Sequence, residues 1–161
     1  MISESAESRP GGISMRISFA VKGALLLLLS PLFCTIVIGA PERDPLPPRV
    51  PDKERAAAQA MKNPVAASPE SIAKGKGLYE GKGTCLKCHG ATGKGDGPGA
   101  KLVRPAPRNM TNPDWQKARA DGEMFWIIKN GSPGTGMVAL IPSDITEDDA
   151  WHIINYVRTL K

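Results

Sequence analysis

A short segment of the sequence, CLKCH, places two cysteines and a histidine at a spacing that suits one metal-containing cofactor. Cys85 and Cys88 are three residues apart, so on about one helical turn both thiols can reach the two vinyl groups at one edge of a porphyrin. His89 directly follows and would lie under the iron. The pattern C-x-x-C-H is typical of covalent haem attachment. We therefore predict one haem c, attached through Cys85 and Cys88, with His89 as an iron ligand.

Other chemistry of cysteine pairs fits this chain less well. A zinc site needs further ligands, yet the only other Cys and His residues, Cys34 and His152, belong to no matching cluster. A thioredoxin-like redox pair requires a preceding strand and a βαβ context, which the sequence does not indicate. Three cysteines are too few for a disulfide framework. The spacing therefore favours haem attachment.

The second axial position of such an iron has several candidate ligands in this sequence, namely Met137, Met110, Met124 and His152. Met137 ends the loop segment GSPGTGM, whose small residues allow the backbone to approach a flat cofactor closely. Met124 lies in an apolar helical segment, where a core methionine is the ordinary explanation. Met110 lies in a polar segment, and His152 borders the apolar face of a predicted helix. We predict Met137, and an iron without a sixth ligand stays open as an alternative.

Helix signals around these residues indicate an all-α fold. Ser68, followed by proline and glutamate, suits the cap of a helix over residues 68–80, which glycines end. Thr146 and the acidic residues after it begin a helix over residues 146–160, with apolar residues at helical spacing. Residues 121–129 form a third helix candidate. No segment shows the convincing alternation of a strand.

The chain before residue 68 differs in character from the rest. Residues 1–40 contain basic residues followed by the uncharged apolar run 23–40, which is typical of a secretory signal peptide or a membrane anchor. Both alternatives predict export, either into the periplasm or to the inner membrane with the domain facing the periplasm. Residues 41–67 are rich in proline and predict an extended linker, within which a short helix around residues 54–61 is an alternative. The domain proper is predicted to comprise residues 68–161.

The charge of the chain limits the classes of partner. The formal net charge is +5, and residues 68–161 contribute 13 basic and 10 acidic residues, a net charge of +3. This charge is too small and too interspersed for a nucleic-acid-binding protein. A modest positive field could still orient the protein toward an acidic partner. The lysines closest in sequence to the haem motifs are the candidates for a basic rim: Lys82, Lys87, Lys94, Lys101 and Lys129.

Residues 68–161 resemble a class I cytochrome c domain, particularly the bacterial kind that is attached to haem–copper oxidases or supplies them with electrons. The matching segments occur in the family's order and are CLKCHG, GKGDGPGAKL, PAPRN, DGEMFWIIKNGSPGTGM and AWHIINYVRTL. The family often has proline after the ligand methionine, where this chain has Val138. The resemblance covers nearly the whole predicted domain.

The resemblance implies a small class I cytochrome c fold, in which three to four short helices wrap around one covalently bound haem. The first and last helices would cross near a right angle. Gly75 would leave room for Tyr156 at this crossing, and Tyr79 would supply an aromatic edge. The haem would lie in a crevice with one edge exposed.

The resemblance also implies roles for the residues around the haem. The iron ligands would be His89 and Met137. The ring of His89 would donate its second N–H to a backbone carbonyl, which we expect to be that of Pro105 in the stiff turn RPAP. Arg108 and Trp115 are expected to hydrogen-bond the haem propionates.

A haem with both axial positions filled has no room for substrate, so the resemblance implies one-electron transfer rather than enzyme activity. The expected partners are redox proteins, with a reductase as donor and a terminal oxidase or another protein as acceptor. One alternative is a subunit of a respiratory or dehydrogenase complex, tethered to the membrane through residues 23–40. A further alternative is a five-coordinate haem for gas binding or peroxidase activity, which requires that Met137 does not bind the iron.

Overall fold

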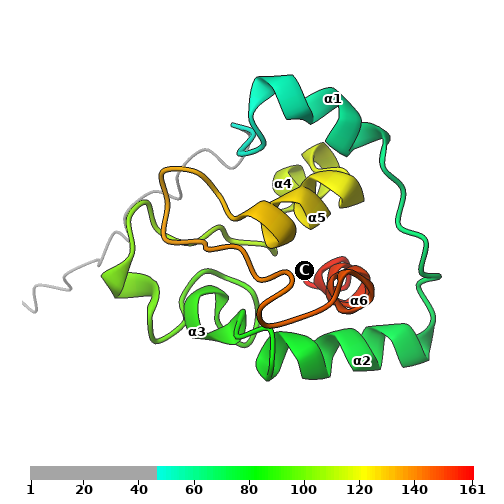
Figure 1. Ribbon diagram of the computed structural model, residues 1–161. Coiled ribbons are helices and arrows are strands. Elements are labelled where there is room, and N and C mark those ends of the chain that lie inside the picture. The colour runs from blue at the N-terminus through cyan, green and yellow to red at the C-terminus, as the bar shows by residue number, and fades with distance from the viewer. Residues whose placement is uncertain (1–46) are drawn as a thin grey trace, which may run out of the picture. The chain divides into compact units, whose positions relative to one another are not determined.

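The computed structural model describes residues 47–161, and within this range the protein consists of helices and loops without a strand (Figure 1). The elements in chain order are α1 (Asp52–Ala60), α2 (Pro69–Glu80), α3 (Leu86–His89), the 3-10 helix η1 (Ala100–Leu102), α4 (Pro113–Ala118), α5 (Asp121–Asn130) and α6 (Glu147–Val157). The prediction of an all-α fold is confirmed. The three helices predicted from sequence are α2, α5 and α6. Helices α3 and α4 are too short to produce a periodic pattern.

The caps predicted for α2 and α6 are present. Ser68 Oγ accepts a hydrogen bond from a backbone N–H of the first turn of α2 at 3.2 Å. Thr146 Oγ1 accepts from the N–H of Asp149 at 3.1 Å, and the Asp149 carboxylate accepts from the N–H of Thr146 at 3.2 Å. This reciprocal pair satisfies two donors at the helix end. Helix α6 ends at Val157, earlier than predicted, and Leu160 stays buried in the turn that follows.

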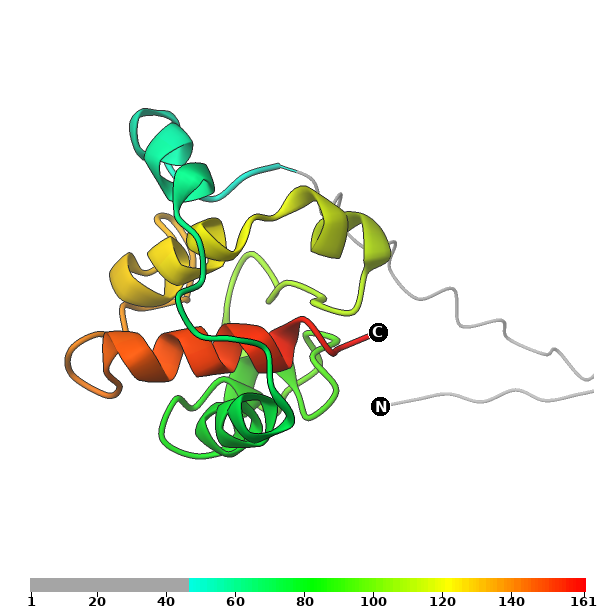
Figure 2. The same cartoon turned by 90° about the vertical axis from the view of Figure 1, so that its right-hand side faces the viewer.

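Helices α2 and α6 cross at a steep angle, since each is seen end-on in the view that shows the other lengthwise (Figures 1 and 2). Gly75 permits their close approach because a Cβ atom there would lie 1.9 Å from the carbonyl oxygen of His152. The rings of Tyr79 and Tyr156 meet edge to face across the same contact, with their centroids 5.2 Å apart. The predicted crossing and its small residue are therefore confirmed.

Helix α5 packs on α6 and completes the core beside the candidate site. The rings of Phe125 and Trp151 stack with 4.1 Å between centroids and 4° between planes. On the side away from α6, α5 contacts α1 (Figure 1). Gly122 makes this contact close, because a Cβ atom there would lie 2.0 Å from the carbonyl oxygen of Ala58. The core thus extends from α2 through α6 and α5 to α1.

Residues 47–67, the described part of the segment predicted as a linker over residues 41–67, pack on the domain and are not extended throughout. This stretch contains α1, and Val50 and Ala58 are 2% and 1% exposed. After α1, the side-chain amide of Asn63 donates to Asn155 Oδ1 at 2.9 Å, and Asn155 donates back to a backbone carbonyl of the same stretch at 3.2 Å. The prolines and charges indicated a spacer. A few apolar side chains and one asparagine nevertheless dock this segment on the domain.

The predicted signal peptide or anchor over residues 1–40 and the beginning of the predicted linker lie outside the described residues. Within residues 47–161, no helix is both long enough and apolar enough to cross a bilayer.

Candidate functional site

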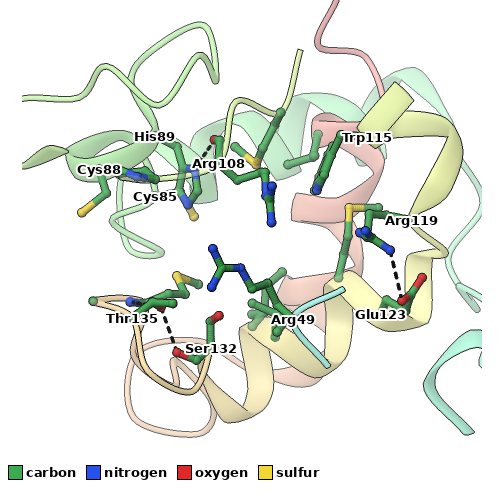
Figure 3. A pocket seen from close by; sticks show the side chains of 18 of the residues that line it. Arg49, Cys85, Cys88, His89, Arg108, Trp115, Arg119, Glu123, Ser132 and Thr135 are labelled. Carbon is green, nitrogen blue, oxygen red and sulfur yellow. Dashed lines mark hydrogen bonds and ion pairs between the residues drawn. The ribbon is translucent and has the colours of Figure 1, made fainter. Parts of the chain in front are cut away.

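A cavity of about 180 Å³ lies between α3, α5, α6 and the loops at residues 103–110 and 132–137 (Figure 3). Its walls are mainly apolar and include Val103, Ile128 and Ile153. Cofactor sites in proteins are typically concave, apolar spaces of this kind with a few polar groups. Every residue predicted for the haem site lines this cavity: Cys85, Cys88, His89, Pro105, Arg108, Trp115 and Met137.

The two cysteines and the histidine are held on and beside the single turn of α3. The N–H groups of Cys88 and His89 donate to the carbonyl oxygen of Cys85 at 3.2 Å and 2.8 Å. The turn ends at Gly90, whose φ of 77° is left-handed and whose Cβ would lie 2.0 Å from the Asp96 carboxylate. Burial raises the pKa of the Cys85 thiol to about 12, so this thiol is protonated at neutral pH.

Helix α2 fixes the position of this turn through Tyr79. The fully buried Tyr79 hydroxyl donates to the carbonyl oxygen of Gly90 at 2.7 Å. Burial raises the pKa of Tyr79 far above its ordinary value, so the hydroxyl stays a donor at physiological pH. The α2–α6 crossing therefore positions the cysteine and histidine turn.

The imidazole of His89 is oriented by a hydrogen bond at one of its two nitrogens. Nδ1 lies 3.0 Å from the carbonyl oxygen of Arg108, and because a carbonyl only accepts, Nδ1 carries the proton. Removal from bulk water lowers the pKa of His89, although the same carbonyl opposes this shift. The ring is therefore neutral at neutral pH and keeps a lone pair on Nε2. This is the form in which histidine binds a metal ion.

The carbonyl that orients His89 belongs to Arg108, so the expectation that Pro105 supplies it is corrected. The N–H of Met110 donates to the carbonyl oxygen of Gly93 at 2.7 Å, which sets the register of this segment against the loop after α3. In that register the carbonyl of Arg108 reaches the ring. Pro105 lies three residues earlier and contributes to the cavity wall instead.

The loop after α5 carries Met137 to the cavity. The N–H of Ser132 donates to the carbonyl oxygen of Met137 at 2.8 Å, and the N–H of Met137 donates to Thr135 Oγ1 at 3.1 Å. Gly131, with a φ of 77°, starts this loop in a conformation that favours glycine. Ser132 and Thr135 lie across the cavity from His89 (Figure 3). The loop that carries Met137 therefore forms the wall that faces the histidine.

The other candidate ligands occupy different environments. Met110 and Met124 also line the cavity, but both are 8% exposed and belong to the hydrophobic core. His152 does not line the cavity, because its Nδ1 lies 2.8 Å from Ser71 Oγ and its Nε2 lies 3.4 Å from the Asp148 carboxylate. The geometry therefore favours Met137 over His152 as a ligand.

Arg108 and Trp115 reach the cavity from the segment that precedes α5 (Figure 3). Asn112 Oδ1 caps α4 by accepting from the N–H of Trp115 at 3.0 Å, which places the 7% exposed indole in the wall. Arg108 Nη2 donates to the carbonyl oxygen of Pro47 at 3.3 Å. Guanidinium and indole groups only donate hydrogen bonds, so this part of the cavity suits an anion.

Three charged residues of the cavity were not predicted from the sequence: Arg49, Arg119 and Glu123. Glu123 is 2% exposed; its Oε2 accepts from the N–H of Ala120 at 2.9 Å, and its Oε1 lies 3.6 Å from Arg119 Nη1. The i, i+4 spacing of this pair was a usable signal, because a glutamate in an apolar helix is rarely buried without a partner. Arg49 offered no signal, since it lay in the predicted linker.

These residues fit a covalently attached haem. Two thiols and a neutral imidazole lie on one turn, a methionine loop faces the imidazole, and donor side chains stand at the edge of an apolar cavity. Fold and site together define a small helical haem protein. Residues 72–161 match the profile of the family described as cytochrome c, and the chain therefore belongs to the cytochrome c family. It is a class I c-type cytochrome, whose cofactor is haem c.

Several solved structures resemble this chain. A chain of the Kuenenia stuttgartiensis reducing HAO-like protein complex Kustc0457/Kustc0458 is 28% identical with a TM-score of 0.54, and the match covers 60% of this chain and 46% of that chain. The KustC0563 c-type cytochrome is 26% identical with a TM-score of 0.46, over 54% and 96% of the two chains. Cytochrome CL from the marine methylotrophic bacterium Methylophaga aminisulfidivorans is 21% identical with a TM-score of 0.45, over 66% and 63%.

This chain thus spans less than half the length of the Kuenenia stuttgartiensis chain that it matches. A search of curated proteins gives no significant match.

Proposed function

We propose that this protein is a one-electron carrier with a single haem c, attached through Cys85 and Cys88 and bound axially by His89 and Met137. The hydrogen bond between His89 Nδ1 and the Arg108 carbonyl, 3.0 Å long, carries the proposal because it leaves Nε2 as the ring nitrogen that can bind iron. The position of the Met137 loop on the facing wall supports the second ligand. The single C-x-x-C-H motif of the sequence supports one haem.

Haem c supplies a reversible exchange of one electron at its iron. The protein residues prepare the site for this chemistry. The carbonyl of Arg108 keeps the His89 imidazole in one tautomer and one orientation. The thioether of Met137, as an iron ligand, would raise the reduction potential relative to a nitrogen ligand. Apolar walls, to which Ile128 and Ile153 belong, exclude water and lower the local dielectric, which further tunes the potential.

The proposed partners are redox proteins that dock at the mouth of the cavity. Leu102 and Val138 are 86% and 66% exposed, and each is adjacent in sequence to a cavity residue, Val103 or Met137. The two segments are neighbours in space, because a Cβ atom at Gly136 would lie 2.5 Å from the Val103 side chain. Exposed apolar side chains beside a cofactor site suit a transient protein contact.

The exposed lysines indicate that the partner is acidic. Lys82, Lys87, Lys94 and Lys101 are exposed and form no ion pair with another residue of the described range 47–161. Lys129, in contrast, pairs with Glu147 at 2.6 Å. Unpaired positive charges around a docking surface mainly increase the rate of association with an acidic protein.

We further propose that the chain is exported, with residues 1–40 acting as a signal peptide or as a membrane anchor. The apolar run 23–40 after basic residues supports export to the periplasm. A second candidate function is that of a tethered electron-transfer subunit of a respiratory or dehydrogenase complex. It is favoured by the likeness to a chain from a protein complex at 28% identity.

Visible spectroscopy of the purified haem-loaded protein tests the axial ligation. We expect sharp bands on reduction and a weak long-wavelength iron–sulfur band on oxidation. Carbon monoxide added to the reduced protein should leave the spectrum unchanged, because a stable methionine ligand resists displacement. A high-spin spectrum with immediate carbon monoxide binding would contradict His89/Met137 ligation and favour gas binding or peroxidase activity.

Electron transfer to an acidic redox protein should become slower as ionic strength rises, because salt screens the attraction between the exposed lysines and the partner. At low salt, Lys87→Gln should lower the second-order rate constant on the order of two- to fivefold. Lys129→Gln is the matched control and should have a smaller effect, since Glu147 already pairs with this lysine. Stopped-flow rates that do not depend on salt would remove the acidic partner from the proposal.

A further inference from the structure

The segment before α1, residues 47–51, borders the haem cavity although it precedes residue 72, where the family match begins. We call this segment the N-terminal arm. Two of its residues, Arg49 and Val50, line the cavity. Val50 is 2% exposed and packs into the protein, whereas Arg49 is exposed. The arm therefore brings a charged side chain to the cofactor site from outside the region shared with the family.

The arm is held at the cavity by hydrogen bonds at both of its ends. Arg108 Nη2 donates to the carbonyl oxygen of Pro47 at 3.3 Å, and Arg55 Nη2 donates to that of Val50 at 3.4 Å. The helix that follows the arm is docked on α5. The position of Arg49 between these anchor points is thus set by the packing of α1 on the domain.

The guanidinium group of Arg49 extends into the cavity, toward the side from which Arg108 enters (Figure 3). Within residues 47–161, Arg49 makes no hydrogen bond and no ion pair. Two guanidinium groups directed into one cavity repel each other, and an anion between them would attract both. A planar guanidinium group also binds a carboxylate with two parallel hydrogen bonds.

The charge of the cavity lining agrees with a dianionic occupant. Three guanidinium groups, those of Arg49, Arg108 and Arg119, and one carboxylate, that of Glu123, give the lining a net charge of +2. Arg119 and Glu123 face each other at 3.6 Å, so their charges largely compensate each other. The other two positive side chains of the lining are Arg49 and Arg108. Haem carries two propionate groups and hence two negative charges at neutral pH.

We propose that Arg49 binds a haem propionate, so that the N-terminal arm is part of the haem site. This proposal rests on the haem c of the family and on the cavity, and does not require Met137 as a ligand. A positive charge beside the propionate stabilises the reduced haem and favours the ionised carboxylate. The carboxylate in turn holds the arm against the domain. Arg108 and Trp115 would then share the propionate edge of the haem with Arg49.

Redox titration of the haem-loaded protein at several pH values tests the contact, with Arg49→Gln as the variant. The potential of Arg49→Gln should lie below that of the unaltered protein. The proton affinity of one propionate should rise at least about tenfold, because a nearby guanidinium group lowers a carboxyl pKa by roughly one to three units. This rise would appear as a new step in the plot of potential against pH. Lys53→Gln removes the same charge from an α1 side chain that is 83% exposed, and it should change neither quantity.

Arg49→Lys keeps the charge and should retain most of the potential. If Arg49→Gln has the potential and the pH profile of Lys53→Gln, the contact does not exist. A lower potential without the new pH-dependent step would also overturn the proposal, because it would show that Arg49 affects the potential from a distance and does not contact a propionate. The long-wavelength iron–sulfur band reports separately on Met137, so a failure of the proposed axial ligation is distinguishable from a failure of this contact.

Discussion

Met137→Ala is expected to remove the iron–sulfur band of the oxidised protein and to make the reduced protein bind carbon monoxide. The reduction potential should fall by on the order of 0.1 V or more, within the roughly 0.8 V range over which axial ligands set haem potentials. The physical reason is that the thioether sulfur stabilises reduced iron better than the ligands that would replace it. A redox titration followed at visible wavelengths measures the band and the potential, and carbon monoxide added to the reduced variant measures the binding.

The matched controls for Met137 are the two other methionines of the cavity, Met110 and Met124. Met110→Leu and Met124→Leu conserve side-chain volume and should cost less than about 1.5 kcal/mol of stability. Both variants should keep the iron–sulfur band and the potential of the unaltered protein. If Met137→Ala keeps the band and one of these two variants loses it, the ligand is the methionine replaced in that variant and not Met137.

Gly75→Ala is expected to destabilise the domain by about 3 kcal/mol or more, because its new methyl group would stand 1.9 Å from the carbonyl oxygen of His152. Backbone atoms yield little, so α2 and α6 would have to separate. This loss is a large fraction of the roughly 5 to 15 kcal/mol by which domains are stable. The midpoint of thermal unfolding, measured by circular dichroism, should fall on the order of 10 to 20 °C.

Gly77→Ala is the control for this effect on the same helix. A Cβ atom at Gly77 has no other atom within 4 Å, so the new methyl group meets only solvent. Alanine is the better helix former, and this variant should gain up to about 1 kcal/mol. Equal stability of the Gly75→Ala and Gly77→Ala variants would show that the α2–α6 crossing does not depend on a small residue.

The features predictable from the sequence are those in which neighbours along the chain act on each other. The spacing of Cys85, Cys88 and His89 places them on one turn, and that turn is α3 with its flanking residue. The caps of α2 and α6 are also local, because Ser68 and Thr146 bind backbone N–H groups three residues further along. Such interactions have the same geometry in any fold that contains the helix.

The partner of the His89 ring could not be predicted in the same way. It depends on the register between the segment at Arg108 and the loop after α3, which the bond from Met110 to Gly93 establishes. A shift of this register by a few residues would change neither the composition nor the periodicity of the sequence, so the sequence does not reveal the register. Pro105 was therefore a reasonable expectation that the three-dimensional arrangement overturned.

The role of residues 47–67 illustrates the same limit. Proline and charged residues in this stretch predicted a spacer, since its own side chains cannot form a core. In the folded protein this stretch packs on α5 and α6. The contacts are made at Gly122 of α5 and Asn155 of α6. With α1 docked, Arg49 stands at the haem cavity, a position that no property of its sequence neighbours indicates.

The residue types and their spacing thus define the cofactor, the helical class and the ends of the main helices, because all of these arise within a few residues of chain. The shape of the cavity, the carbonyl that orients His89 and the charges around the cofactor arise from contacts between distant segments. Those contacts depend on how closely α2, α5 and α6 pack, and close packing is a property of the folded chain. Only the tertiary structure could therefore assign Arg49 to this site and identify the Arg108 carbonyl as the partner of His89.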